Sequence, residues 1–185
     1  MPTNQQFTDK GIGIDPGLTG AVAAVWENGA RYEVWDIPTI RVGAKKEYDI
    51  WKLTEILKKC GYTGGGGQVS LPCYVEKVGA MPKQGLASTF KFGMGYGIAQ
   101  ACAISAGHRM TLIRPQSWKK VMLRDMKKDK GGSCARATQL FPNAELTGPR
   151  GGAKDGRCEA LLLAELARRE NFGGGLRLGV DAHAG

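Results

Sequence analysis

The chain has 185 residues, of which 42% are hydrophobic and 23% are charged, and its formal net charge is +9. This balance predicts one globular domain with a substantial core, and no apolar run approaches the roughly 20 residues that cross a bilayer. The positive charge favours a polyanionic partner. Nucleic acid is favoured over a membrane surface, because no strongly amphipathic basic helix stands out.

The two ends of the chain differ in composition from the middle. Residues 1–10 are polar, contain no signal-peptide apolar region and predict a disordered arm. Residues 172–185 are rich in glycine and predict a flexible tail. The folded domain is therefore expected over residues 11–171.

The first half of the chain predicts an antiparallel meander followed by a helix. Residues 12–15, 21–26 and 31–37 are expected strands, with turns at Asp15-Pro16-Gly17 and at Glu27-Asn28-Gly29. The segment 49–60 has apolar residues at helical spacing, and its first residue, Asp49, is suited to cap a helix.

The second half alternates between strands and helices. Strands are predicted at residues 74–78 and 109–114, and helices at residues 86–106, 115–123, 135–141 and 155–171. Basic loops are expected at residues 127–132 and 147–154. A meander that continues into β-α-β units predicts an α/β fold with a five-stranded mixed sheet, order 3-2-1-4-5, and helices on both faces.

The cysteines and histidines indicate no metal site. The five cysteines are scattered and form no C-x-x-C pair, so the sequence predicts free thiols in a reducing compartment, with no zinc knuckle and no disulfide framework. His108 and His183 have no His or Cys neighbour at ligand spacing, and both are interpreted as non-catalytic.

Four acidic residues fall where the expected sheet would bring them together. Asp15 ends the first strand and Glu76 ends the fourth, and these strands are neighbours in the expected order. Asp155 and Glu159 are four residues apart, so they share one face of the last helix. Taken singly, each has a plainer interpretation: a turn residue, a solvated strand end, a helix cap and an exposed helix residue.

Taken together, the four carboxylates predict a cation site. Like charges in one cleft raise each other's pKa unless cations neutralise them. Oxygen ligands without sulfur or imidazole indicate Mg²⁺, with Mn²⁺ as a substitute. Two such ions about 4 Å apart suit phosphodiester hydrolysis, and the basic surface around them suits phosphate binding.

Four segments strengthen this interpretation: IGIDPGLTG, YVEKVGAMPKQGLASTFKFGMGYGIAQA, RPQSWKKVM and KDGRCEALLLAELARR. Together, and in this order, they resemble RuvC-type Holliday junction resolvases over about residues 11–171. The G-R-x-E-A-L-L-L-A form of the last helix is most similar to the chloroplast (monokaryotic chloroplast) resolvases of plants and algae and to related phage and bacterial proteins. The resemblance implies an RNase H-like fold, a homodimer, and Mg²⁺-dependent symmetrical nicking of four-way DNA junctions.

The resemblance also assigns roles by matched position. Asp15 and Glu76 take the first two metal-binding places, Asp155 the third, where many relatives have histidine, and Glu159 the fourth. The last two residues are usually three apart in the bacterial members and are four apart here, which favours the chloroplast branch. That branch implies a chloroplast location with a transit peptide absent from this chain; otherwise the location is cytoplasmic.

Contacts to DNA are expected around the acidic cleft. In the loop 79–84, Met81 and Pro82 are suited to wedge against unstacked bases, and Lys83 and Gln84 to contact phosphate or base edges, although an ordinary loop is the alternative. A dispersed basic set is suited to phosphate contacts, with Lys119 expected nearest the scissile phosphate: Lys119, Lys120, Lys127, Lys128, Lys130, Arg150, Lys154 and Arg157.

Some alternatives remain open at this stage. The long helix, with Phe90, Phe92 and Tyr96, is either a dimer interface or a core helix of a monomer. The segment GIDPGLTG also resembles the first phosphate loop of actin-like ATPases and sugar kinases, which generally need two such domains. A non-catalytic junction-binding protein and an RNase H-like nuclease for RNA–DNA hybrids are further possibilities.

Overall fold

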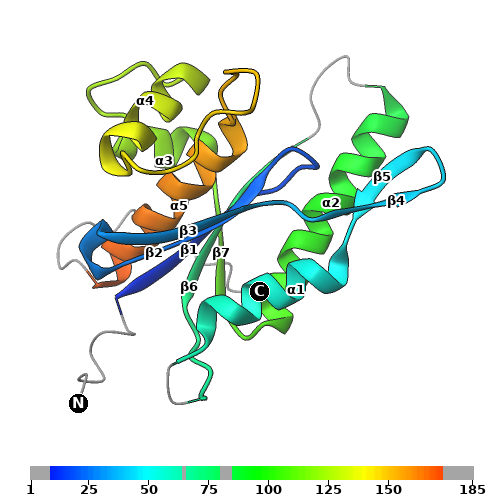
Figure 1. The fold of residues 1–185 in the computed structure, drawn as a ribbon, viewed down its shortest axis with the longest axis horizontal. Coiled ribbons are helices and arrows are strands. Elements are labelled where there is room, and N and C mark those ends of the chain that lie inside the picture. The colour runs from blue at the N-terminus through cyan, green and yellow to red at the C-terminus, as the bar shows by residue number, and fades with distance from the viewer. Residues whose placement is uncertain (1–8, 64–65, 80–84, 173–185) are drawn as a thin grey trace.

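The computed structural model describes residues 9–63, 66–79 and 85–172, and its centre is a five-stranded mixed sheet (Figure 1). The strands β1 (Lys10–Asp15), β2 (Ala21–Trp26) and β3 (Arg31–Asp36) form an antiparallel meander, with the short 3-10 turn η2 (Glu27–Gly29) between β2 and β3. The strands β6 (Pro72–Glu76) and β7 (Arg109–Ile113) extend the sheet parallel to β1. The order β3-β2-β1-β6-β7 confirms the predicted arrangement, counted over the strands of this sheet.

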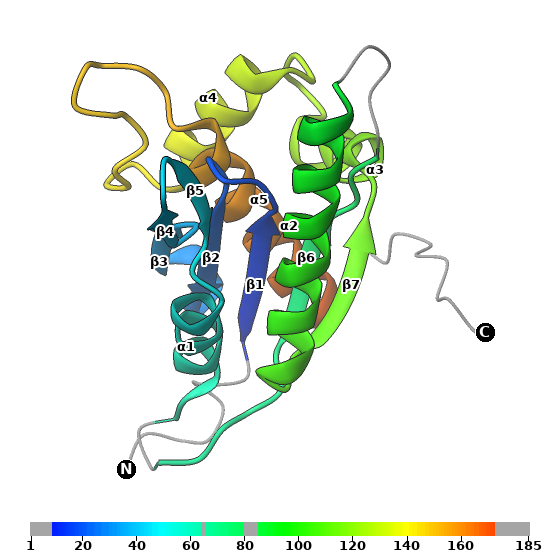
Figure 2. The ribbon, with the colours of Figure 1, turned by 90° about the vertical axis from the view of Figure 1, so that its right-hand side faces the viewer.

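Helices cover both faces of the sheet (Figure 2). One face packs against α1 (Ile50–Gly61) and α2 (Leu86–Ser105). The other packs against α5 (Asp155–Phe172), with α3 (Pro115–Met122) and α4 (Lys130–Leu140) beyond it. The strand β2 shows the alternation that makes this possible, because Val22 faces the first core and Ala23 the second. Among the described helices, none has the length and apolar character needed to span a membrane.

Two glycines of β1 set the distance between the sheet and α5. A Cβ atom at Gly11 would collide with the backbone of Ala164, and one at Gly13 with the backbone of Ala160. The backbones of β1 and α5 therefore approach more closely than side chains would allow. This approach brings the first turns of α5 to the carboxyl end of β1, where Asp15 lies.

The structure differs from the sequence prediction in two local elements. The segment between β3 and α1 forms a hairpin, β4 (Thr39–Val42) and β5 (Lys45–Tyr48), which was not predicted. Helix α4 begins at Lys130, so the predicted loop at 127–132 and helix start at residue 135 are wrong. The reason is a cap at Asp129, whose Oδ1 accepts from the backbone N–H of Gly132 at 2.8 Å.

The prediction that all cysteines are free thiols is also wrong. Cys134 of α4 and Cys158 of α5 form a disulfide, with their Cα atoms 5.0 Å apart. The two helices pack against each other, and this tertiary contact pairs cysteines that are 24 residues apart. Cys60, Cys73 and Cys102 are buried free thiols, as predicted.

Candidate metal centre

Three carboxylates from three different elements converge at one end of the sheet. Asp15 is the last residue of β1, Glu76 is the last of β6, and Glu159 lies near the start of α5. Each offers one carboxylate oxygen, and these oxygens all lie within 4.8 Å of one another. The pairing of Ile14 with Val75 explains the meeting of the first two, because parallel neighbours end at the same sheet edge.

The three acids repel one another in a largely buried place. Glu76 and Glu159 are 8% and 7% exposed. The pKa of Asp15 is raised to about 7, first by burial and then by the charges of Glu76 and Glu159. Burial also raises the pKa of Glu76, and the charge of Glu159 adds to this. Such a cluster favours the binding of a cation. The bound cation would offset both the repulsion among the three carboxylates and the free-energy cost of burying their charge.

Hydrogen-bond donors fix two of these carboxylates. The indole Nε1 of Trp118 donates to Glu76 Oε1 at 2.9 Å. The hydroxyl of Ser133 lies 3.2 Å from Glu159 Oε1 and 3.1 Å from the Asp129 carbonyl oxygen, so these two acceptors share its one proton. The sequence analysis assigned no role in the site to either Trp118 or Ser133. No sequence pattern marks Ser133, because its place depends on how α4 packs against α5.

Two lysines neutralise part of the acidic charge. The ammonium of Lys119 lies 2.7 Å from Glu159 Oε1, which places this residue at the cluster. Lys130 lies 3.1 Å from Asp155 Oδ2. Asp155 itself lines the same cleft but stands outside the group of three carboxylates. The four predicted acids therefore share one cleft, and three of them form its tight cluster.

The cleft around the acids is large enough for an extended ligand. Its volume is about 1170 Å³, and its lining includes Asp15, Glu76, Asp155 and Glu159. Three residues of the predicted basic set line it as well: Lys130, Lys154 and Arg157. Four others, Lys120, Lys127, Lys128 and Arg150, are exposed and lie outside the lining that the structure describes. Met81, Pro82, Lys83 and Gln84 fall outside the described residues.

Two of the basic side chains that line the cleft, Lys154 and Arg157, form hydrogen bonds with Asp36 of the sheet. Arg157 Nη2 and Lys154 Nζ each donate to Asp36 Oδ2 at 3.1 Å. Hydrogen bonding from Arg157 is the main cause that lowers the pKa of Asp36. Asp36 ends β3, so these contacts tie the residues that enter α5 to the sheet. Arg157 and Lys154 consequently stabilise the position of the acid-bearing helix.

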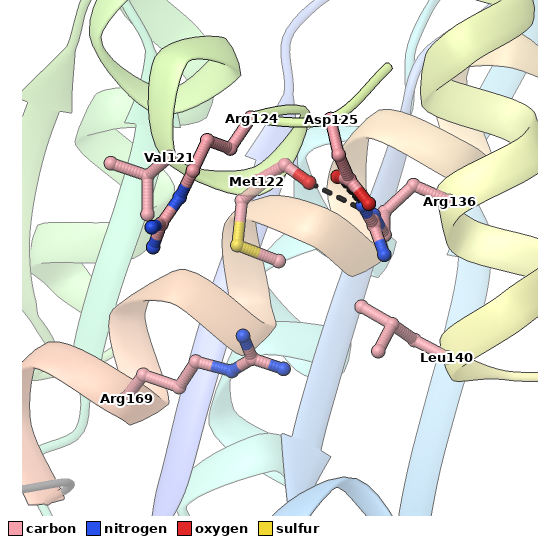
Figure 3. Close-up of a pocket in the computed structure, with 7 residues that line it drawn as sticks. All are labelled: Val121, Met122, Arg124, Asp125, Arg136, Leu140 and Arg169. Atoms are coloured by element: carbon pink, nitrogen blue, oxygen red, sulfur yellow. Dashed lines mark hydrogen bonds and ion pairs between the residues drawn. The ribbon is translucent and has the colours of Figure 1, made fainter.

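A second hollow, of about 370 Å³, lies between α3, α4 and α5 (Figure 3). Its lining includes three arginines, Arg124, Arg136 and Arg169, and one acid, Asp125. Arg136 is engaged there, because it pairs with Asp125 and its Nε donates to the Met122 carbonyl at 3.0 Å. One paired carboxylate does not make a divalent-cation site, so the acidic cleft is the better candidate for chemistry.

Comparison with solved structures identifies the fold. A structure of RuvC from Thermus thermophilus matches with a TM-score of 0.50 and 17% identity, over 88% of this chain and 97% of that one. The T. thermophilus RuvC structure in complex with a Holliday junction substrate matches with a TM-score of 0.57 and 18% identity, over 88% and 96%. The fold is the RNase H-like fold of RuvC. No family model and no curated protein matches the chain.

Proposed function

We propose that this protein is a metal-dependent endonuclease of the RuvC type, which resolves four-way DNA junctions by paired symmetrical nicks. One observation carries the proposal. In a RuvC-like fold, Asp15, Glu76 and Glu159 converge from β1, β6 and α5 at one cleft. The chain's net charge of +9 suits a polyanionic substrate, and the similar T. thermophilus RuvC structure is itself in complex with a Holliday junction substrate.

The donor set fits Mg²⁺, with Mn²⁺ as a substitute. All three ligands are carboxylates, and no thiol or imidazole joins them. Burial first, and then the charges of Glu76 and Glu159, raise the pKa of Asp15, and a bound cation would offset both effects. Asp15, Glu76 and Glu159 would hold the metal, and Asp155 is proposed to complete a site for two ions. When bound, such ions supply Lewis-acid activation of water and charge stabilisation at the scissile phosphate.

Other side chains of this protein contact the metal-binding carboxylates or are suited to contact the DNA. The indole of Trp118 orients the carboxylate of Glu76, and the hydroxyl of Ser133 lies within hydrogen-bond distance of the carboxylate of Glu159. The ammonium of Lys119 is already placed at the cluster, where it suits a contact with the scissile phosphate. The loop residues Met81, Pro82, Lys83 and Gln84, and the exposed Lys120, Lys127 and Lys128, are proposed as further DNA contacts.

A homodimer is proposed through α2. Leu86, Phe90 and Met94 recur every four residues, share one side of this helix and are 92%, 73% and 44% exposed. A Cβ at Gly93 or Gly97 would meet nothing within 4 Å, so room for a second copy remains beside this stripe. A two-fold protein presents two clefts to a junction that is itself two-fold.

The chloroplast branch is proposed from the form of the last helix and from the spacing of four between Asp155 and Glu159. A chloroplast location follows from that branch. A cytoplasmic location is the proposal if the branch assignment fails.

The test combines product mapping with one isosteric variant. A labelled mobile four-way junction is incubated with the protein and Mg²⁺, and paired nicks placed symmetrically across the junction are expected. The variant Glu76→Gln should bind the junction and fail to cut it, because its amide oxygen can still accept from Trp118 but supplies no charge to a cation. Random nicking of linear duplex, or preferred cutting of an RNA–DNA hybrid, would contradict the proposal. Retained cleavage by Glu76→Gln would remove Glu76 from the metal site.

A further inference from the structure

The hairpin of β4 and β5 is a separate two-stranded sheet that extends away from the main sheet (Figure 1). Its outer residues, from Ile40 to Glu47, are all exposed. An exposed two-stranded sheet buries little apolar surface, so the hairpin contributes little to the core of the domain. The side chains on its two faces therefore indicate what the hairpin does.

The strand register puts two positive charges opposite each other. Thr39 pairs with Tyr48 and Arg41 with Lys46, so these four side chains share one face. The pairs Ile40–Glu47 and Val42–Lys45 occupy the other face, so the hairpin's own acid lies away from Arg41 and Lys46. Like charges directly opposite each other destabilise a sheet. Among the described residues, none forms an ion pair with Arg41 or with Lys46.

The charged face continues the wall of the metal centre. Lys46 and Thr39 line the same cleft as Asp15 and Glu76. Tyr48, at the base of this face, is buried against α2, because a Cβ at Gly95 would collide with its ring. The charge of Asp15 also acts on Tyr48, adding to the effect of burial in raising its pKa to about 12. The base of the hairpin is thus fixed beside the acids, and its cationic pair stands farther out.

We propose that Arg41 and Lys46 bind backbone phosphates of the DNA strand that enters the metal centre. The inference rests on the proposed nuclease function. Lys46 lies two residues from Tyr48, which is about 7 Å along a strand. At 3.4 Å per nucleotide of one DNA strand, this corresponds to about two nucleotides from the base of the hairpin. A phosphate between the two side chains relieves their repulsion, and the Arg41 guanidinium can hold it with two hydrogen bonds.

The test measures how binding depends on salt. Binding of a four-way junction and of a linear duplex is titrated from 50 to 200 mM salt, without Mg²⁺, in the Glu76→Gln background. Adding Arg41→Gln and Lys46→Gln removes two phosphate contacts and should make the negative slope of log K against log[salt] shallower by about 1.8. The loss of affinity over this range then becomes about tenfold smaller than in the parent.

The matched control is Lys45→Gln, which removes one charge from the opposite face of the same hairpin and should leave the slope nearly unchanged. Thermal melting should show no loss of stability in the double variant, since a repulsive pair is removed. A slope unchanged on both substrates, or changed equally by Lys45→Gln, overturns the role of the hairpin. A shallower slope in the double variant, with equal binding of the four-way junction and the linear duplex, supports phosphate binding by the hairpin. The same result counts against the proposed resolvase function.

Discussion

Replacing Asp15 by asparagine should stabilise the metal-free protein. Asn keeps the shape of the side chain and removes one of three like charges, and its amide N–H groups can donate to the neighbouring carboxylates. The pKa of Asp15 is raised from 3.8 to about 7 by burial and by the charges of Glu76 and Glu159. The ionised carboxylate therefore opposes folding, and its removal should favour the folded state.

The size of the effect follows from this pKa. A rise from 3.8 to about 7 corresponds to a cost on the order of 4 kcal/mol for the ionised form. Asparagine still buries a polar group, so we expect about half of this, ~2 kcal/mol, to be recovered. For a chain of this size, that gain raises Tm by about 4 to 8 °C.

The assay is thermal melting in a chelator at several pH values. Because the folded-state pKa of Asp15 lies above its unfolded value, the cost is fully present above about pH 7 and disappears below about pH 4. The gain in Tm from Asp15→Asn should therefore be largest above about pH 7 and should disappear below about pH 4. Asp155→Asn is the matched control, and it should give no gain because Asp155 is paired with Lys130. An unchanged or lower Tm for Asp15→Asn at pH 8 would refute the electrostatic reasoning.

Three further predictions follow from the same geometry. Mg²⁺ should raise Tm more at pH 8 than at pH 5.5, because protons compete for Asp15 near its raised pKa; an equal rise at both pH values would count against binding at this site. Asp155→His should retain part of the junction cleavage, since Asp155 stands outside the tight cluster, and complete loss in a folded variant would show that the carboxylate is required. Gly13→Ala should lower Tm by about 6 to 12 °C, since the added methyl forces β1 away from α5 at a cost of about 3 kcal/mol; a change under about 2 °C would contradict the close approach.

The sequence was informative where local pattern and sheet geometry agree. The convergence of Asp15 and Glu76 follows from the adjacency of two parallel strands, and Glu159 could be placed because its helix must cover the same sheet. The roles of Trp118 and Ser133 could not be predicted, because each depends on packing between elements distant in sequence.

The hairpin and α4 were missed for local reasons. The strand β5, Lys45-Lys46-Glu47-Tyr48, lacks the alternation of apolar and polar residues that identifies a half-buried strand. The glycines at 131 and 132 argue against a helix, yet the Asp129 cap and tertiary packing start α4 ahead of them. The Cys134–Cys158 pair depends on that same packing, so its spacing carries no recognisable signal.

The central claim is that Asp15, Glu76 and Glu159 hold a divalent cation, and anomalous diffraction from crystals soaked in Mn²⁺ tests it most directly. The account predicts a manganese peak bounded by these three carboxylates, and its absence from Glu76→Gln crystals soaked in the same way. A fully soaked wild-type crystal with no peak in this cleft, or with manganese only at other acids such as Asp125, would contradict it.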